Sequence, residues 1–239
     1  MSSEGFIETH YQGKVFEAFY VHNQTAQHRP VVLIFHPWRG RDEFVKDRAF
    51  QLSRMGYFAV AVDLYGKGIV GKDDEECEKL MMPMIENRLE IYEKVLKIID
   101  QLKENPYADV NQIAAIGFCF GGLCALDMAR RMKQLRGVVS FHGLLLPLES
   151  HQKISGKVLI LHGYKDPMVS IKDLEMVAKE MEEAETNFEI IIYGKAYHAF
   201  TNPLVNSPQK GTVYNEEIAK RAYLAMQNFL HEIFIGQFH

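Results

Sequence analysis

Short apolar runs alternate with longer amphipathic stretches along most of this chain. The apolar runs have the length and continuity of strands buried on both faces, and they occupy residues 31–35, 57–63, 113–118, 137–143, 157–163 and 188–194. The amphipathic stretches have helical periodicity and occupy residues 43–55, 75–104, 122–134, 170–184 and 215–234. Near the start, KVFEAFYVH (14–22) alternates apolar and polar residues, and FIETHY before it is a possible partner strand. Strands that alternate with helices predict parallel β-α-β units, and therefore an open, mostly parallel sheet with helices on both faces.

No internal repeat and no Pro-, Gly- or Ser-rich linker divides the chain, so the pattern predicts one domain over residues 1–239. One connection is unusual, because residues 64–83 are first glycine-rich, then acidic and then methionine-rich. A lid over a binding site and a plain surface excursion both fit this composition. In open parallel sheets, ligands bind beyond the carboxyl ends of the strands, so chemistry is sought in the residues that follow each strand.

Composition narrows the classes of protein to which this chain can belong. Hydrophobic residues make up 47% of the 239 residues and charged residues 24%, as in soluble globular proteins with a sizeable core. The net charge of −4 gives no reason to expect nucleic acid or an anionic membrane as a partner. The polar first residues indicate no signal peptide, and no run approaches the roughly 18 apolar residues of a membrane helix. Three cysteines form no disulfide framework, which favours a reducing, cytoplasmic location.

A cysteine lies at the sharpest predicted turn, between the strand at 113–118 and the helix that follows. The sequence GFCFG (117–121) has the spacing of the Gly-x-Ser-x-Gly nucleophile elbow, with Cys119 in the serine position. Such a turn lifts the nucleophile above the sheet, and the N-terminus of the next helix favours a thiolate. The backbone N–H of Phe120 is then a candidate oxyanion donor. The alternative is that Cys119 is a small core residue in a chance pattern.

An acid and a base follow two later strands, in the chain order of the α/β-hydrolase architecture. Asp166 lies in the loop after 157–163, where Pro167 disfavours a helix, and His198 lies in the loop after 188–194. In this interpretation His198 is the base and Asp166 orients its ring. Asp63 is a rival acid, although it precedes the cysteine in the chain. Other histidines near the same edge of the sheet are His36, His142 and His162.

The segment HPWRG (36–40) follows an inner strand, where a second oxyanion donor is expected. Pro37 has no N–H group, so the backbone N–H of Trp38 is the best candidate. The Trp38 side chain could also line an acyl pocket, and simple core packing fits it nearly as well.

Taken together, GFCFGG, HGYKDPMV and YHAFTNP resemble the dienelactone hydrolases, a branch of the α/β-hydrolases with a Cys–Asp–His triad. The resemblance runs from about the HPWRG segment to the end of the chain. It implies an α/β-hydrolase fold and the activity of a carboxylic-ester hydrolase, or carboxylesterase. It also implies that Cys119 is the nucleophile, Asp166 the orienting acid and His198 the base.

Two positions depart from the pattern of that family. Its dienelactone-cleaving members carry a glutamate where this chain has Pro37, and an arginine that holds the substrate carboxylate where this chain has Asn202. The family's glutamate beside the thiol and its arginine for the substrate carboxylate therefore do not carry over to this chain. The candidates to contact substrate are Asn202 and the positive side chains of Arg39, Arg41 and Arg88.

The resulting prediction is a hydrolase of small-molecule activated esters, lactones or thioesters that works through a cysteine acyl-enzyme. No metal or organic cofactor is expected, because the sequence has no His-x-x-x-His pair, no P-loop and no Gly-x-Gly-x-x-Gly after the first inner strand. Two alternatives are a non-catalytic α/β-hydrolase scaffold that binds a small molecule and a thiol redox sensor that uses Cys119 with Cys124 or with a partner. The sequence does not indicate an oligomeric state.

Overall fold

The computed structural model describes residues 2–24, 28–148 and 153–235. The contacts between residues divide the chain into two compact units, residues 1–115 and 116–239. Strand β5 (Ala108–Phe118) runs from the first unit into the second. The prediction of one domain over 1–239 also includes the residues outside the described ranges, and it stays a prediction.

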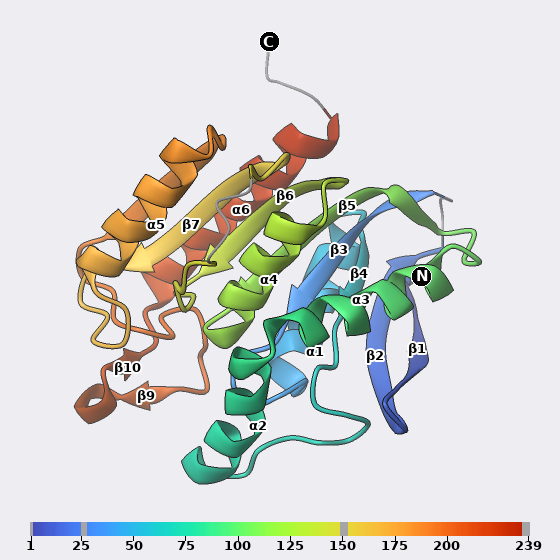
Figure 1. Cartoon of the computed structure of the whole chain (residues 1–239), viewed down its shortest axis with the longest axis horizontal. Coiled ribbons are helices and arrows are strands. Elements are labelled where there is room, and N and C mark those ends of the chain that lie inside the picture. Colours follow the sequence, from blue (N-terminus) through green and yellow to red (C-terminus); the bar gives the residue numbers. More distant parts are fainter. Residues whose placement is uncertain (1, 25–27, 149–152, 236–239) are drawn as a thin grey trace. The chain divides into compact units, whose positions relative to one another are not determined.

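The first unit contains a four-strand set in the order β1-β2-β4-β3 (Figure 1). Strands β1 (Ser2–Tyr11) and β2 (Lys14–Asn23) form an antiparallel hairpin, and β2 also pairs antiparallel with β4 (Phe58–Ala61). Strand β3 (Arg29–Phe35) pairs parallel with β4. Residues 31–35 are fully buried, which is why this strand reads as an unbroken apolar run.

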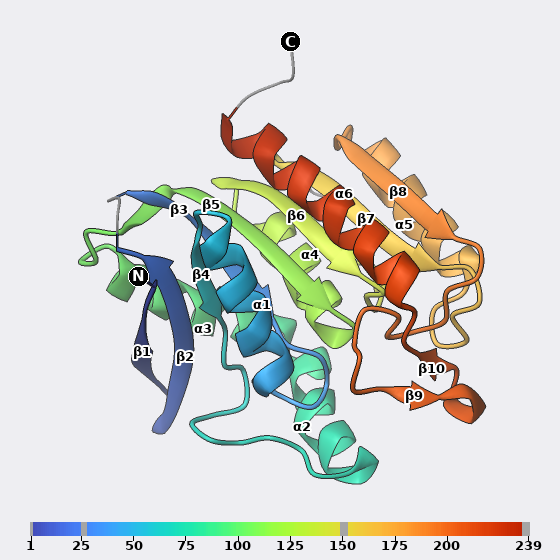
Figure 2. The same ribbon diagram turned by 180° about the vertical axis from the view of Figure 1, so that it is seen from behind.

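Helices α1 (Glu43–Arg54) and α3 (Arg88–Leu102) lie on opposite sides of these strands, α3 in front in Figure 1 and α1 in front in Figure 2. Helix α1 begins at Asp42, whose side chain accepts a hydrogen bond from the Phe44 N–H group at 3.1 Å. This cap satisfies one of the N–H groups that have no partner within the helix.

One predicted helix is in fact two, so the single helix over 75–104 was wrong. Helix α2 (Asp74–Glu86) ends where Asn87 adopts φ −120° and ψ 70°, outside the helical region, and α3 begins at the next residue. Only residues 64–73 of the unusual 64–83 connection are therefore loop, because the remainder belongs to α2. Amphipathic periodicity persists through a one-residue break, so the pattern alone does not reveal it.

The second unit contains three parallel strands in the order β6-β7-β8. These are β6 (Leu135–Phe141), β7 (Lys157–Gly163) and β8 (Phe188–Tyr193). Their carboxyl ends share one edge, so the loops that follow β7 and β8 start side by side.

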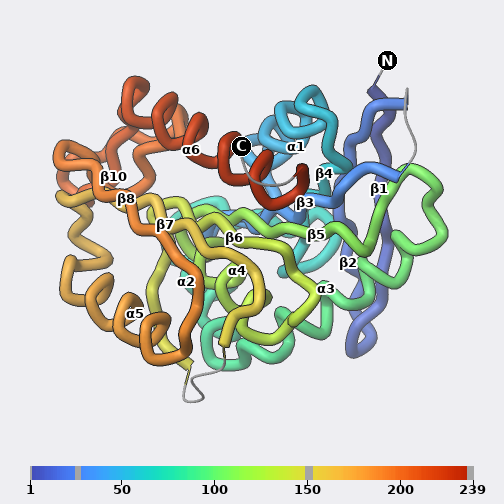
Figure 3. The backbone as a smooth tube through the Cα atoms, turned by 90° about the horizontal axis from the view of Figure 1, so that it is seen from above, coloured from blue at the N-terminus to red at the C-terminus, as the bar shows by residue number. Residues whose placement is uncertain are grey.

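Helices cover both sides of these three strands, as Figure 3 shows along their edge. Helices α4 (Phe120–Arg131) and α5 (Ile171–Glu183) lie on one side, and α6 (Glu216–Ile235) lies on the other. Within the described ranges, no helix is long and apolar enough to cross a membrane.

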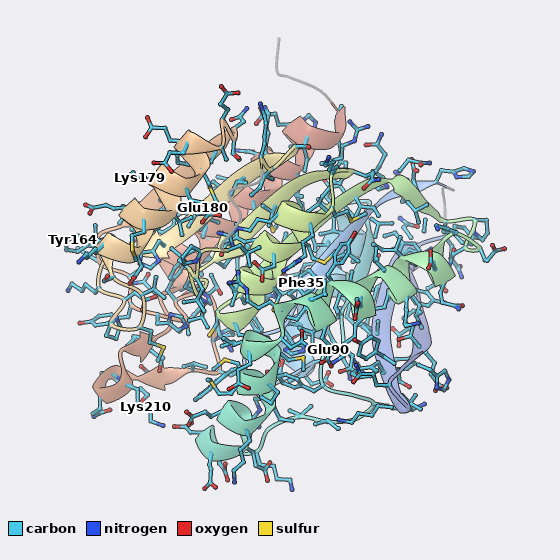
Figure 4. All side chains as sticks on the ribbon, in the orientation of Figure 1. Phe35, Glu90, Tyr164, Lys179, Glu180 and Lys210 are labelled. Atoms are coloured by element: carbon cyan, nitrogen blue, oxygen red, sulfur yellow. The ribbon has the colours of Figure 1, made fainter. Side chains whose placement is uncertain are left out.

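Helices α4 and α5 are joined by a buried ion pair. The Arg130 guanidinium donates to both carboxylate oxygens of Glu180, at 2.9 and 2.8 Å, and to Asp127 at 3.1 Å. In Figure 4, Glu180 and its exposed neighbour Lys179 are labelled on α5. Because all three charges are paired, their burial does not leave an isolated ion in the core.

A small hairpin after β8 was not predicted. It consists of β9 (Asn206–Ser207), a short 3-10 turn (Pro208–Lys210) and β10 (Thr212–Val213). Lys210, labelled in Figure 4, lies on that turn. Two-residue strands are too short to produce a readable alternation.

Candidate active site

Cys119 occupies a strained turn between β5 and α4. Its φ of 55° and ψ of −121° are rarely adopted by a residue with a side chain. The backbone around it holds this conformation, because the Cys119 N–H donates to the Phe141 carbonyl at 3.1 Å. The Cys119 carbonyl accepts from the N–H groups of Gly122 at 2.9 Å and Leu144 at 3.1 Å. Cys119 is partly exposed.

Glycine is required at this turn because the chain folds back onto itself. A β-carbon at Gly117 would lie 1.8 Å from the carbonyl oxygen of Gly121, the other glycine of the motif. A β-carbon at Gly122 would lie 2.5 Å from the α-carbon of Gly143. The spacing of the glycines therefore follows from contact between the end of β5, the start of α4 and the loop after β6.

Helix α4 begins directly after the cysteine, with Phe120 as its first residue. The first N–H groups of a helix have no partner within it and carry the positive end of its dipole, so this terminus favours negative charge near Cys119. Cys124 lies in the same helix and is fully buried. A fully buried thiol is poorly suited to resolve an oxidised Cys119, which weighs against a Cys119–Cys124 redox pair.

The predicted acid and base lie in direct contact in the second unit. The Nδ1 atom of His198 is 2.7 Å from Oδ2 of Asp166, and both side chains are buried. The other oxygen of Asp166 accepts from the N–H groups of Met168 at 2.8 Å and Val169 at 3.1 Å. Since a carboxylate oxygen only accepts, Nδ1 of His198 carries a proton and Nε2 is left to exchange one.

The electrostatic surroundings of His198 link it to Cys119. Burial alone would lower the pKa of His198, but the negative charge of the Cys119 thiolate, with the hydrogen bond to Asp166, raises it to about 10. A hydrogen bond to Cys119 makes a smaller contribution in the same direction, although Nε2 is buried and meets no described partner within normal hydrogen-bond geometry. His198 therefore interacts with Asp166 on one side and with Cys119 on the other.

A second buried histidine packs against the first. The rings of His142 and His198 meet edge to face with their centres 5.2 Å apart, and Nε2 of His142 is 2.8 Å from Oγ1 of Thr201. Burial, and then the neighbouring His198, hold the pKa of His142 well below its usual range. His142 is therefore a neutral packing partner and not a second base. His162 contacts the carbonyl of Val169 through Nε2 at 3.0 Å, and burial lowers its pKa as well.

The rival acid, Asp63, is occupied by backbone groups of the first unit. Its Oδ1 accepts from the N–H groups of Tyr65 and Gly66, both at 3.0 Å, and its Oδ2 accepts from the N–H of Glu17 at 2.9 Å. Both oxygens are used to hold a turn and a strand together.

His36 is also a structural residue. Its Nδ1 donates to the carbonyl of Pro37 at 2.7 Å, and its Nε2 accepts from the N–H of Leu64 at 3.3 Å. Burial lowers its pKa to about 4, so it stays neutral and fixes the start of the 36–40 loop.

The remaining predicted residues fall into two groups. Asn202 is in the second unit, where its side-chain oxygen accepts from the Leu204 N–H at 3.0 Å, which leaves its amide nitrogen as the candidate donor. Trp38, Arg39 and Arg88 belong to the first unit, and their roles stay predictions. In that unit the carbonyl of Trp38 accepts from the Tyr65 hydroxyl at 2.9 Å.

Arg41 is less suited to a substrate than the other arginines. It is buried and forms an ion pair with Glu17 at 3.2 Å. Across the described ranges, no three His, Cys, Asp or Glu side chains gather so as to hold a metal ion.

Comparison with known proteins places the chain in a family. The model of the Dienelactone hydrolase family matches residues 16–234. An uncharacterized protein of Caenorhabditis elegans, K02A2.1, is 36% identical over 57% of this chain and 89% of its own. A Saccharolobus solfataricus protein with the provisional name carboxymethylenebutenolidase is 27% identical over 84% of this chain and 89% of its own. A Bradyrhizobium protein provisionally named a 2-oxo-3-(5-oxofuran-2-ylidene)propanoate lactonase is 29% identical over 72% and 73%.

Solved structures bear out the predicted architecture. The structure named m3DLH superposes with a TM-score of 0.91 at 30% identity, over 98% of this chain and 99% of its own. MGS-M1, an alpha/beta hydrolase enzyme from a deep-sea metagenome, superposes with a TM-score of 0.69 at 16% identity, over 96% and 98%. The predicted α/β-hydrolase fold is confirmed.

Proposed function

Because this chain belongs to the dienelactone hydrolase family, it is a hydrolase, and we propose that it cleaves activated esters and lactones through an acyl-enzyme on Cys119. One observation carries the proposal. His198, oriented by Asp166 at 2.7 Å, has its pKa raised by the Cys119 thiolate on the strained turn. Nucleophile, base and orienting acid are the groups that covalent acyl transfer needs.

In the first half of the reaction, the Cys119 thiolate attacks the carbonyl carbon of the substrate. A sulfur–carbon bond forms, and the carbonyl oxygen becomes an oxyanion. When the oxyanion collapses, the carbon–oxygen bond to the leaving group breaks and His198 gives its Nε2 proton to that oxygen. For a lactone, the released hydroxyl or enol stays attached to the acyl chain.

In the second half, water hydrolyses the thioester. Neutral His198 takes a proton from the water as its oxygen attacks the acyl carbon, and the carbon–sulfur bond then breaks. Cys119 leaves as the thiolate and the imidazolium is restored, so the pair returns to its starting state.

Two backbone N–H groups are proposed to stabilise the oxyanion, those of Phe120 and Trp38. Phe120 is supported by its position as the first residue of α4. The loss of one oxyanion donor costs about 3–4 kcal/mol of barrier in well-studied hydrolases. These donors should therefore matter as much as the base.

The leaving group defines the substrate class. A thiolate leaves a tetrahedral adduct more readily than an alkoxide does, so simple alkyl esters should revert to the starting ester. Enol lactones, aryl esters and thioesters avoid this problem because their leaving groups are stable anions. The provisional lactonase name of the Bradyrhizobium relative supports the same class. Arg39, Arg88 and Asn202 are the proposed contacts to substrate.

Intact-mass spectrometry during reaction with p-nitrophenyl acetate tests the proposal. An acetyl adduct should appear on the native protein, map to Cys119 and decay with turnover. It should be absent from Cys119→Ala, and in His198→Ala its formation should fall by about 10²–10⁴-fold. Cys124→Ala is the matched control, because it removes a buried thiol from the same helix and should behave like the native protein.

Two results would contradict the proposal. An unchanged mass with equal hydrolysis in all variants would favour the non-catalytic scaffold. Reversible oxidation of Cys119 that alters function while His198→Ala has no effect would favour the redox sensor. Since the reaction needs a free thiol, we also propose that the protein works in a reducing compartment such as the cytoplasm.

A further inference from the structure

Gly211 lies at the end of the short turn in the unpredicted hairpin. Its φ of 67° and ψ of 25° are in the left-handed region, and its N–H donates to the Pro208 carbonyl at 3.0 Å. Glycine adopts this conformation at little cost, which explains part of its presence there.

The hairpin also holds the backbone of the catalytic base. The His198 N–H donates to the Gly211 carbonyl at 3.0 Å, and the His198 carbonyl accepts from the Val213 N–H at 3.0 Å. His198 and Thr212 thus form an isolated parallel bridge. These two hydrogen bonds therefore fix the backbone of His198 relative to the hairpin.

Gly211 touches the loop of the acid as well. A β-carbon at Gly211 would lie 2.2 Å from Cγ and 2.7 Å from Cδ of Pro167, the residue after Asp166. Carbon atoms in contact are about 3.5–4.0 Å apart, so even a methyl group does not fit. Proline has little freedom to move aside, because its ring is part of the backbone.

We propose that Gly211 is a positioning residue that sets the distance between the acid and the base. Its carbonyl holds the backbone of His198, and its bare α-carbon lets Pro167 approach, so one residue fixes both loops. A side chain at this position must displace either Pro167 or the hairpin. Either movement lengthens the 2.7 Å contact between Asp166 and His198. This inference rests on the proposed function for its kinetic consequence.

The alternative is that Gly211 serves only the left-handed turn. The two interpretations differ in what a change at Pro167 does. Strain in the turn is unaffected by the neighbouring ring, whereas the steric conflict disappears when Cγ and Cδ are removed. Pro167→Ala should therefore rescue Gly211→Ala only if Gly211 acts through the contact.

The experiment compares four proteins with the native one: Gly211→Ala, Pro167→Ala, the double variant and the control Gly194→Ala. Gly194 lies in the loop before His198, and a β-carbon there meets nothing within 4 Å. The readouts are kcat and KM for an activated ester, and the low-field proton NMR signal of the Nδ1 proton of His198, recorded without substrate. The signal is identified by its loss in His198→Ala.

Gly211→Ala should lower kcat by about 10–100-fold with KM within about threefold, since small misplacement of catalytic groups has effects of this size. The low-field signal should shift or disappear. Pro167→Ala alone should lower kcat by about threefold through a looser acid loop, and the double variant should return to within about threefold of Pro167→Ala, with the signal restored. Gly194→Ala should match the native protein.

An active Gly211→Ala with an unchanged signal would overturn the inference, and so would a double variant as defective as Gly211→Ala. If Gly211→Ala does not fold, the double variant carries the test, because it keeps the strain of the turn and lacks the steric conflict with Cγ and Cδ of Pro167. A double variant that also fails to fold would then overturn the inference. If the native protein forms no acyl-enzyme, the proposed function fails, while the NMR signal still tests the contact.

Discussion

Two buried aspartates, Asp63 after β4 and Asp166 after β7, make the same local turn and yet serve different purposes. In each, Oδ1 accepts from the backbone N–H groups two and three residues further along the chain. The difference is the second oxygen. In Asp63 it accepts from the N–H of Glu17 in β2, and in Asp166 it accepts from the imidazole of His198. A shared turn fixes the carboxylate, and the partner of the second oxygen distinguishes the structural Asp63 from Asp166, for which we propose a role in catalysis.

Two histidines repeat this comparison. His36 uses both ring nitrogens on backbone groups, and burial lowers its pKa to about 4. His198 uses Nδ1 on the side chain of Asp166, has no backbone partner for Nε2 among the described residues, and has its pKa raised to about 10 despite burial. The side chain for which we propose a catalytic role is the one that has a polar atom without a backbone partner.

The largest expected effect is on activity, from Asp166→Asn. The amide keeps an oxygen for the turn but offers an N–H group to His198, which favours the wrong tautomer. kcat should fall by about 10³–10⁴-fold, while the free energy of unfolding changes by less than about 1–2 kcal/mol. Steady-state kinetics and urea unfolding check both parts. A loss of activity below tenfold would mean that the carboxylate does not orient the base.

Asp63→Asn should have the opposite profile. Its amide nitrogen would face the N–H of Glu17, donor against donor, so the free energy of unfolding should fall by about 2–3 kcal/mol. The folded fraction should keep kcat within about threefold of the native value, measured at a temperature where the variant is folded. An inactive but fully stable variant would show that Asp63, and not Asp166, serves the chemistry.

The pH dependence of stability separates the two kinds of histidine. Unfolded His36 binds a proton below about pH 6.5, whereas folded His36 does so only near pH 4, so its contribution to stability is lost as pH falls between these values. Each pH unit in this window costs up to about 1.4 kcal/mol per buried neutral histidine. In His36→Asn, the loss between about pH 6.5 and 5.5 should therefore be smaller by about 1 kcal/mol.

The sign is reversed for His198, whose raised pKa stabilises the folded protein below about pH 6.5 and loses that contribution as the pH rises toward 10. The effect of His36 is measured by urea unfolding of the native protein and of His36→Asn at several pH values. Identical pH dependence in the two proteins would contradict the assignment of a neutral His36.

The smallest effect is expected at Asp173, whose carboxylate also accepts from a backbone N–H group. Its Oδ2 accepts from the N–H of Ser170 at 2.7 Å, in a capping box at the start of α5. Hydrogen bonds from Ser170 lower the pKa of Asp173, so its contribution is lost as the pH falls through that lowered pKa. Asp173→Asn should cost about 0.5–1 kcal/mol of unfolding free energy and leave kcat unchanged. A change in kcat would show that the capping box also positions the nearby acid loop.

Much of the fold was predictable because buried strands produce continuous apolar runs. The run 157–163 coincides with β7, and the other runs match their strands to within a few residues, apart from β5, which begins five residues earlier than predicted. The break between α2 and α3 was not predictable, since one non-helical residue at Asn87 leaves the periodicity intact. The hairpin at 206–213 was missed because its strands are only two residues long.

The candidate site was predictable where position on the sheet decides it. Asp166 and His198 follow the neighbouring parallel strands β7 and β8, and Cys119 follows β5, so the order of the elements indicated the roles proposed for them. The strained conformation of His142, with φ of 38°, and its hydrogen bond to Thr201 depend on packing between loops far apart in sequence. The contact of Gly211 with Pro167 is of the same kind. No local pattern in the amino-acid sequence predicts such contacts.

The elbow has a consequence for the evolution of this site. The direction of the Cys119 side chain is fixed by backbone hydrogen bonds to Phe141, Gly122 and Leu144, none of which involves the sulfur. The backbone therefore fixes where the side chain of residue 119 lies without fixing which atom that side chain carries. A single codon change can replace the sulfur at this position by another atom while the turn persists. Evolution can therefore change the chemistry of this position by substituting one side chain, and the fold remains the same.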